Sequence, residues 1–360
     1  MSSSLREKAE TSTDLGPAAL LAAWRAASGR PHDVAVELGV SEGALLQAAA
    51  LADGRSCTWL DPTRVRDVLM QLPALGQVMA LTRNHAVVHE KIGTYGLGEL
   101  DGHVGLIIND GIDLRLFLDH WRHMVAVDDC EEIGLRASLQ WFDASGAAVH
   151  KVFLRPTSDR SAFDAMVASA RCPRAAAEAH FMPYPPANTV ADAAVERESL
   201  ISEWSQLEDT HEFQSLLRRH RVAREQALRL APPEFAGQVA NASLEATLTH
   251  VAAVELPIMV FVRNRGCVQI HSGKVERIEP MDAWLNVLDP GFNLHVRRAA
   301  IARTWVVRKP TRHGVVSALE AYDADGDLVL TLFGARPARE PEPEGWRAWI
   351  DHLADAMPPC

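Results

Sequence analysis

The 360-residue chain has few of the features that mark secreted, zinc-binding or membrane proteins. Its five cysteines are scattered, odd in number and without a CxxC pair, so we expect neither a disulfide framework nor a zinc site. The longest apolar runs, such as residues 256–262, have the length of a strand and not of a membrane span. Residues 1–14 are polar and of mixed charge, unlike a secretory signal. We therefore expect a cytoplasmic protein without stable membrane insertion.

Positive charge is also scarce. Lysine and arginine number 36 against 47 acidic residues, and the net charge of −11 disfavours general affinity for nucleic acid. Residues 17–54 are typical of helices, with a turn at 38–40 before Ser41 as an N-cap, and superficially suggest a helix-turn-helix. Acidic residues nevertheless outnumber basic ones over residues 1–55. We therefore expect a helical cap on the first domain, and a DNA-binding regulator is the least favoured hypothesis.

An internal repeat is the most informative feature of the chain. Shifted by 180 residues, half of its length, the sequence matches itself without a gap over a long stretch. Residues 111–115 fall on 291–295, and residues 142–146 fall on 322–326. The same glycine turns and apolar positions recur in both copies, so the copies should share a fold. The shared fold does not explain residues that are present in only one copy, so we expect functional residues where the two halves differ.

The repeats are predicted to be residues 1–181 and 196–360. The intervening segment, 182–195, is rich in proline, which cannot continue a helix and favours an extended linker.

Each repeat should contain an antiparallel sheet. Short apolar runs separated by Gly, Asn and Asp turn signals form one meander at 76–155 and a second at 256–334. Asp143–Gly146 and Asp323–Gly326 have the composition of hairpin turns. A last helix is expected after Pro343, where aromatic and aliphatic residues recur at helical spacing. The predicted fold class is α+β: a tandem duplication of a domain with a large antiparallel β-sheet and flanking helices.

His211 is the histidine with the most informative surroundings. Asp209 is a candidate N-cap with Glu212 as its capping-box partner, which would place His211 in the first turn of a helix. The positive end of the helix dipole disfavours imidazolium and so favours the neutral ring that donates a lone pair to iron. On spacing alone, a polar first-turn residue that faces water is the simpler interpretation.

Cationic segments follow His211. One is Arg218–Arg221 with Arg224 and Arg229, and a second lies at 303–312 and includes Lys309. A solvated helix face usually explains such runs. Cations that converge from two segments would also bind paired carboxylates through charge-assisted hydrogen bonds. A neutral histidine, an apolar sheet and such cations are together what a haem site requires.

Several long and unusual segments carry a family resemblance over most of residues 30–350. They are His89–Gly93, Ile112–Leu118 with His120–Trp121, Asp209–Phe213, Pro257–Val262, Asn264–His271, Trp284–Pro290, Phe292–His295 and Trp305–Pro310. With these segments the chain resembles the bacterial cytoplasmic haem-utilisation family of HemS, HmuS, ShuS and PhuS, also called hemin-degrading factors. The resemblance implies two large antiparallel sheet domains with flanking helices, and haem b bound in a cleft of the C-terminal half.

The resemblance also implies a set of site residues. His211 would be the proximal iron ligand and the metal-binding residue. Arg115 and Phe261 would line the distal face, while Arg224, Lys309 and Arg336 would meet the propionates or the pocket rim.

Two positions depart from the family pattern. Leu330-Thr331 stands where relatives have a Tyr-Gln pair, so a phenol near the propionates is lost. Gln214 stands where some relatives have a second histidine that could exchange with the iron ligand, so that exchange is not available here.

Two functions remain open at this point. The resemblance implies a cytoplasmic haem-binding protein that accepts imported haem from an importer at the inner membrane and passes it on, for instance to a haem oxygenase, for iron acquisition. The alternative is an enzyme that opens the porphyrin ring with an external electron donor. No dedicated acid, base or reductant site is visible in the sequence, so we assign no catalytic residue.

Overall fold

The computed structural model describes residues 15–27, 29–109, 111–185, 189–337 and 339–356. The predictions for residues 1–14, and for 186–188 of the linker, lie outside these ranges. The chain forms two compact units. The first unit comprises Met1–Arg83, Glu90–Tyr184 and Asn264–Gln269, and the second comprises Asn84–His89, Pro185–Arg263 and Ile270–Cys360. Strands β3 (Val87–Thr94) and β12 (Cys267–Gly273) have residues in both units. The repeat boundaries at residues 181 and 196 stay predictions.

The first unit contains a five-stranded antiparallel sheet in the order β1-β7-β8-β9-β2. The strands are β1 (Cys57–Leu60), β2 (Gln77–Arg83), β7 (His123–Val127), β8 (Ser138–Phe142) and β9 (Ala148–Leu154). Strands β4 (Glu99–Asp101), β5 (Val104–Ile108) and β6 (Asp113–Phe117) form an antiparallel meander. The helices are α2 (Pro17–Ala26), α3 (Pro31–Leu38), α4 (Glu42–Ala52), α5 (Val65–Gln71), α6 (Arg160–Ala170) and α7 (Pro173–Glu178).

The second unit contains the corresponding sheet in the order β10-β16-β17-β18-β11. The strands are β10 (Ala236–Val239), β11 (Ile258–Arg263), β16 (Arg303–Thr311), β17 (Gly314–Tyr322) and β18 (Leu328–Gly334). Its meander consists of β13 (Ile278–Met281), β14 (Trp284–Asp289) and β15 (Phe292–Arg297). The helices are α8 (Arg197–Ser205), α9 (Glu212–His220), α10 (Arg224–Leu230), α11 (Ser243–Ala253) and α12 (Glu344–Ala356).

The predicted duplication is confirmed by this topology. The order α4-β1-α5-β2 in the first unit recurs as α10-β10-α11-β11 in the second. The two sheets also share an irregularity, because the register shifts between Trp141 and Phe142 in β8 and between Ala321 and Tyr322 in β17. These positions are 180 residues apart, the same shift that aligns the sequence with itself. The predicted fold class, α+β with a repeated antiparallel sheet, is therefore correct.

Helices α2, α3 and α4 cap the first unit, as predicted. Leu45 and Leu46 of α4 are fully buried in one core with Trp59 of β1. Ser41 is the N-cap of α4, and its hydroxyl accepts a hydrogen bond from the backbone N–H of Ala44. Among the described residues, no single helix is long and apolar enough to cross a membrane. Helices α3 and α4 together have the necessary length and composition, but a bend of 98° separates them.

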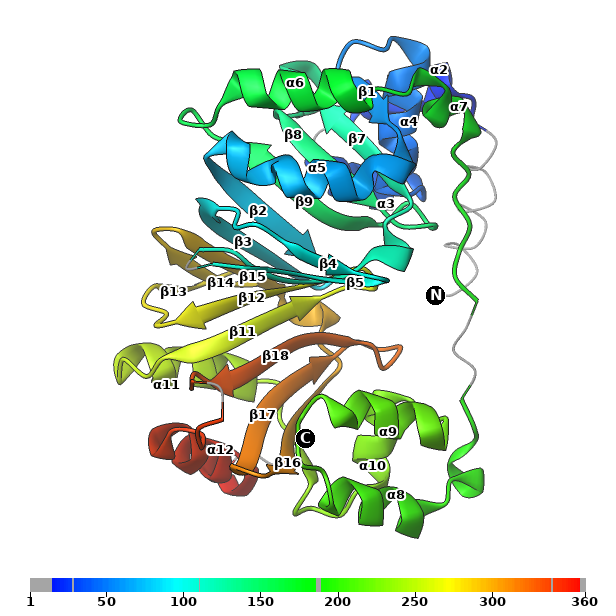
Figure 1. Cartoon of the computed structure of the whole chain (residues 1–360). Coiled ribbons are helices and arrows are strands. Elements are labelled where there is room, and N and C mark those ends of the chain that lie inside the picture. The colour runs from blue at the N-terminus through cyan, green and yellow to red at the C-terminus, as the bar shows by residue number, and fades with distance from the viewer. Residues whose placement is uncertain (1–14, 28, 110, 186–188, 338, 357–360) are drawn as a thin grey trace. The chain divides into compact units, whose positions relative to one another are not determined.

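The sheet of the second unit is covered by different helices on its two faces (Figure 1). Val306 and Leu319 face a core that includes α11 and the buried face of α12. Trp305, Val307 and Tyr322 point the other way, into a core with α8, α9 and α10. Alternation of side chains along each strand produces this division. The face under α8–α10 is the one that positions the candidate site.

Candidate functional site

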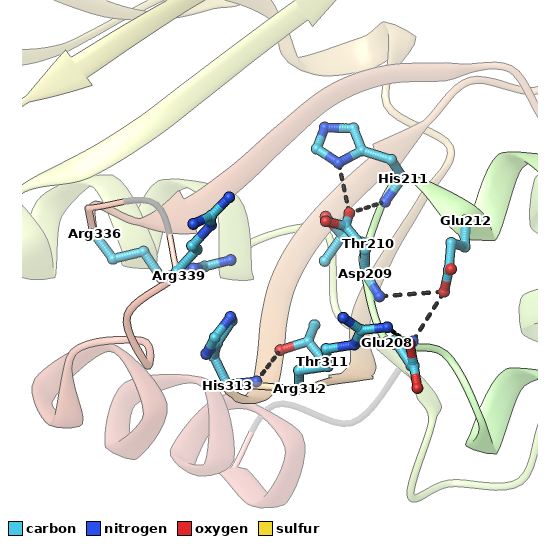
Figure 2. Close-up of a pocket in the computed structure, with 10 residues that line it drawn as sticks. All are labelled: Glu208, Asp209, Thr210, His211, Glu212, Thr311, Arg312, His313, Arg336 and Arg339. Atoms are coloured by element: carbon cyan, nitrogen blue, oxygen red, sulfur yellow. Dashed lines mark hydrogen bonds and ion pairs between the residues drawn. The ribbon is translucent and has the colours of Figure 1, made fainter.

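A pocket of about 810 Å³ lies in the second unit. Three segments line it: Glu208–Glu212 before and at the start of α9, Thr311–His313 in the β16–β17 turn, and Arg336 with Arg339 after β18 (Figure 2). Its size falls within the roughly 300–1,000 Å³ of small-molecule pockets in general.

His211 lies at the N-cap of α9 and not in its first turn, because the helix begins at Glu212. The Asp209 carboxylate accepts a hydrogen bond from the backbone N–H of His211 at 2.8 Å, whereas the predicted capping box would have it accept from the backbone N–H of Glu212. Half of the predicted capping box is present: the Glu212 carboxylate accepts from the backbone N–H of Asp209 at 3.2 Å. Glu212 thus holds the segment that carries Asp209 and His211.

The imidazole of His211 is held at Nδ1 by Asp209. Its Nδ1 lies 2.6 Å from Oδ1 of Asp209 (Figure 2). Because an ionised carboxylate only accepts hydrogen bonds, Nδ1 carries a proton, and in the neutral ring the lone pair is therefore on Nε2. The side chain is 93% exposed, and Nε2 has no partner among the described residues. The hydrogen bond donated by the backbone N–H of His211 also holds the pKa of Asp209 below its usual range, although burial acts to raise it.

An arginine pair faces His211 across the pocket (Figure 2). Arg336, one of the predicted site residues, lines the pocket and donates a hydrogen bond to the backbone carbonyl of Glu340. Arg339 lines it too, and its guanidinium has no partner among the described residues. Sequence reasoning missed Arg339 and also His313. The only available signal for Arg339 was its position three residues after Arg336.

Arg312 ties the β16–β17 turn to the histidine segment. Its Nε donates to the Glu208 carboxylate at 2.7 Å, and its backbone N–H donates to the Glu208 carbonyl at 3.1 Å. His313 follows Arg312 in this turn, and its ring has no partner among the described residues. The two pocket walls are therefore connected by both backbone and side-chain bonds.

Arg224 and Lys309 lie in a buried cluster around Glu320. Arg224 donates two hydrogen bonds to this carboxylate, of which the bond from Nε is 2.8 Å long. Lys309 Nζ lies 3.2 Å from the same carboxylate. The Tyr322 hydroxyl donates to it at 2.5 Å. Burial opposes ionisation of Glu320, but the two cations hold its pKa well below the usual range. Burial lowers the pKa of Lys309 to about 8, although Glu320 acts to raise it.

This cluster lies close to the helix that follows His211. The ring of Phe213 in α9 has the Arg224 guanidinium 5.1 Å from its centroid and Lys309 Nζ 4.8 Å from it. With two cations and one carboxylate in direct contact, the cluster carries excess positive charge. The contacts of Arg224 and Lys309 with propionates stay predictions, since in this structure both cations bind Glu320.

Phe261 lies in one row of the sheet with Glu320. It pairs across β11 and β18 with Thr331, which pairs across β18 and β17 with Glu320. Directly opposed residues lie on the same face of a sheet, so Phe261 lies on the face that α8–α10 partly cover. It is half-buried and packs edge-on against Phe333 at 5.2 Å. Leu330, the first residue of the departing pair, faces the opposite core.

Arg115 belongs to the first unit, on β6, where it forms an ion pair with Asp113. Its guanidinium side chain is 33% exposed. Its predicted place on the distal face stays a prediction.

Residues of the pocket and of the cluster around Glu320 have no counterparts in the first repeat. At a shift of 180 residues, His211 falls on Pro31, Lys309 on Asp129 and Arg336 on Pro156, while Glu320 falls on Gln140. The shared fold does not require these side chains, which agrees with the expectation that function lies where the halves differ.

Comparisons with known proteins agree with the resemblance. The model of the haemin-degrading HemS.ChuX domain matches the chain twice, over residues 39–170 and 221–353. The hemin transport protein HmuS of Yersinia pestis is 38% identical over 327 residues, which cover 89% of this chain and 92% of that protein.

Two solved structures are similar over nearly the whole chain. Holo-PhuS, a heme-binding protein from Pseudomonas aeruginosa, is 41% identical with a TM-score of 0.87, and the match covers 94% of this chain and 99% of that one. ChuS, described as an E. coli heme oxygenase, is 34% identical with a TM-score of 0.83, covering 93% of this chain and 99% of that one. The chain therefore belongs to the family of haemin-degrading HemS.ChuX domain proteins, and it carries this domain twice.

Proposed function

We propose that the protein binds haem b through His211 in the pocket of its second unit, accepts imported haem in the cytoplasm and passes it on for iron acquisition. The observation that carries the proposal is the Asp209-bound imidazole of His211, which lines a pocket with Arg336 and Arg339 and whose Nε2 has no partner in the part of the chain that the structure describes. The heme-binding relative PhuS, 41% identical, supports haem as the ligand.

The residues present fit haem chemically. A neutral imidazole nitrogen is an axial ligand for haem iron. Arg336 and Arg339 offer planar guanidinium groups, which match carboxylates in geometry and charge, so they suit the propionates. Arg224 and Lys309 would contribute positive charge near the propionates. Phe261 and Arg115 would form the surface on the distal side of the haem. Each of these contacts is part of the proposal.

A single iron ligand on an exposed segment suits a carrier. Such a site has to hold haem firmly and still release it, and among the described residues the side chain of His211 is anchored by Asp209. We propose an importer at the inner membrane as donor and a haem oxygenase as acceptor. The name of the 38% identical relative, hemin transport protein HmuS, supports this direction.

The test is a hemin titration followed at the Soret band. We expect saturation near one haem per chain for the wild type. His211→Ala should show a changed spectrum and retention weaker by at least about tenfold, because loss of even a ligand's hydrogen-bond partner costs roughly 10–100-fold in metal affinity.

His103→Ala is the matched control. His103 is also exposed, and its Nδ1 lies 2.5 Å from an Asp119 oxygen, but this pair belongs to the first unit and does not line the pocket. Its titration should match the wild type. If His211→Ala also matched the wild type, the ligand assignment would be wrong.

Oxidative opening of the porphyrin ring is the second candidate, favoured by the 34% identity to the ChuS heme oxygenase. The two candidates differ in one observation. A carrier's haem complex keeps its Soret band when mixed with a reductant, whereas an enzyme's complex loses it even with catalase present. Loss that catalase abolishes would be peroxide damage only.

A further inference from the structure

The Asp209 carboxylate accepts two hydrogen bonds from His211, the proposed iron ligand. Oδ1 of Asp209 receives both the backbone N–H of His211, at 2.8 Å, and the ring Nδ1, at 2.6 Å. Two bonds from one residue to one oxygen restrain the position of the backbone and the rotation of the ring together. The imidazole is thereby oriented before any ligand arrives.

The other acidic residues of the pocket are engaged elsewhere. Glu212 accepts from the backbone N–H groups of Glu208 and Asp209, at 2.9 and 3.2 Å. Glu208 binds Arg312. Among the described residues that line the pocket, Asp209 is therefore the carboxylate that reaches the ring of His211.

From this geometry, and resting on the proposed function, we propose that Asp209 is the positioning residue of the iron ligand. It holds His211 as the Nδ1–H tautomer, directs Nε2 outward, and strengthens the Nε2 lone pair by accepting the Nδ1 hydrogen as a carboxylate. A ligating histidine commonly donates its second ring N–H to such a group, which raises ligand basicity. A more basic ligand stabilises ferric relative to ferrous iron, so Asp209 should favour retention of oxidised haem.

The first measurement uses the ligand-free protein. Nitrogen chemical shifts of ¹⁵N-labelled histidine should report His211 as the Nδ1–H tautomer in the wild type. In Asp209→Ala, the shifts should move toward a mixture of tautomers, because the partner that selects one of them is gone.

The second measurement uses the hemin complex of Asp209→Asn. Asparagine keeps an oxygen for the backbone N–H of His211 and removes only the charge. We expect a shift of the ferric/ferrous midpoint potential to a more positive value, a lower iron–histidine stretching frequency in the reduced complex, and about 10–100-fold weaker retention of ferric haem. Asp119→Asn, which alters the analogous pair with His103, is the matched control and should change none of these quantities.

The outcomes separate this inference from the proposed function. If Asp209→Asn leaves the potential and the stretching frequency unchanged while His211→Ala abolishes the wild-type spectrum, the role of Asp209 is refuted and haem ligation by His211 stands. If His211→Ala itself leaves the spectrum unchanged, the ligand assignment fails, and the inference fails with it. A shift in Asp209→Asn with unchanged thermal unfolding supports the inference.

Discussion

A buried histidine in the first unit should make the protein acid-sensitive. His150 of β9 is fully buried, with Thr82 Oγ1 2.8 Å from Nδ1 and the Tyr95 hydroxyl 2.5 Å from Nε2. Burial lowers the pKa of His150 to about 3, from 6.5 for an unperturbed ring. Below pH 6.5 the unfolded chain therefore binds a proton that the folded chain does not. Stability contributed by the neutral ring is fully present above pH 6.5 and is lost as the pH falls toward 3.

The size of the effect follows from the two pKa values. Each pH unit below 6.5 costs about 1.4 kcal/mol while the folded ring stays neutral, so lowering the pH from 7 to 5 should cost about 2 kcal/mol through His150 alone. At pH 5 the folded ring is still neutral, because its pKa lies well below that value.

His150→Gln isolates this contribution. Glutamine still offers a donor and an acceptor to Thr82 and Tyr95 but does not titrate. Free energies of unfolding from urea denaturation at pH 7 and pH 5 should fall by about 2 kcal/mol more in the wild type than in this variant. His32, whose pKa burial lowers to about 4, contributes to both proteins alike. His103→Gln changes an exposed ring and should behave as the wild type. Equal losses in wild type and His150→Gln would refute the reasoning.

Two further predictions concern the second unit's cation cluster and a turn of the first unit. Lys309→Met should change the free energy of unfolding by less than about 1.5 kcal/mol in urea denaturation, because methionine fills the volume of the buried cation and Arg224 still binds Glu320. Hemin retention should weaken in the same variant. A loss of stability above about 3 kcal/mol would contradict this account. Gly146→Ala should lower stability by about 1–3 kcal/mol in the same assay, because Gly146 has φ +78° and an added Cβ would lie 2.1 Å from Ser41 Oγ. Gly237→Ala, whose Cβ would meet nothing within 4 Å, is its control and should cost less than about 1 kcal/mol.

Much of the fold follows from local patterns. The start of α4 at Glu42 after the Ser41 cap, and the hairpin at Asp143–Gly146, both match the predictions. Asp143 accepts from the backbone N–H groups of Ser145 and Ala147, so it acts as a turn residue, as expected. Such features depend on residues within four positions of one another, and the sequence displays these directly.

The start of α9 was predicted less well for an equally local reason. The Asp209 carboxylate accepts hydrogen bonds from the backbone N–H and the ring Nδ1 of His211. A capping box would instead have it accept from the backbone N–H of Glu212. The capping-box pattern does not distinguish these alternatives, because both use the same residues.

The sequence by itself determined the duplication, the strand and helix order, and the kinds of side chain available for a haem site. Only the tertiary structure decided which of those side chains meet. It places Arg339 and His313 in the pocket with His211, and it brings Arg224 to Glu320, 96 residues away, and Glu208 to Arg312, 104 residues away. Pairings over such distances depend on sheet register and on how helices pack on the sheet. Neither is encoded in the spacing of neighbouring residues, whereas secondary structure largely is.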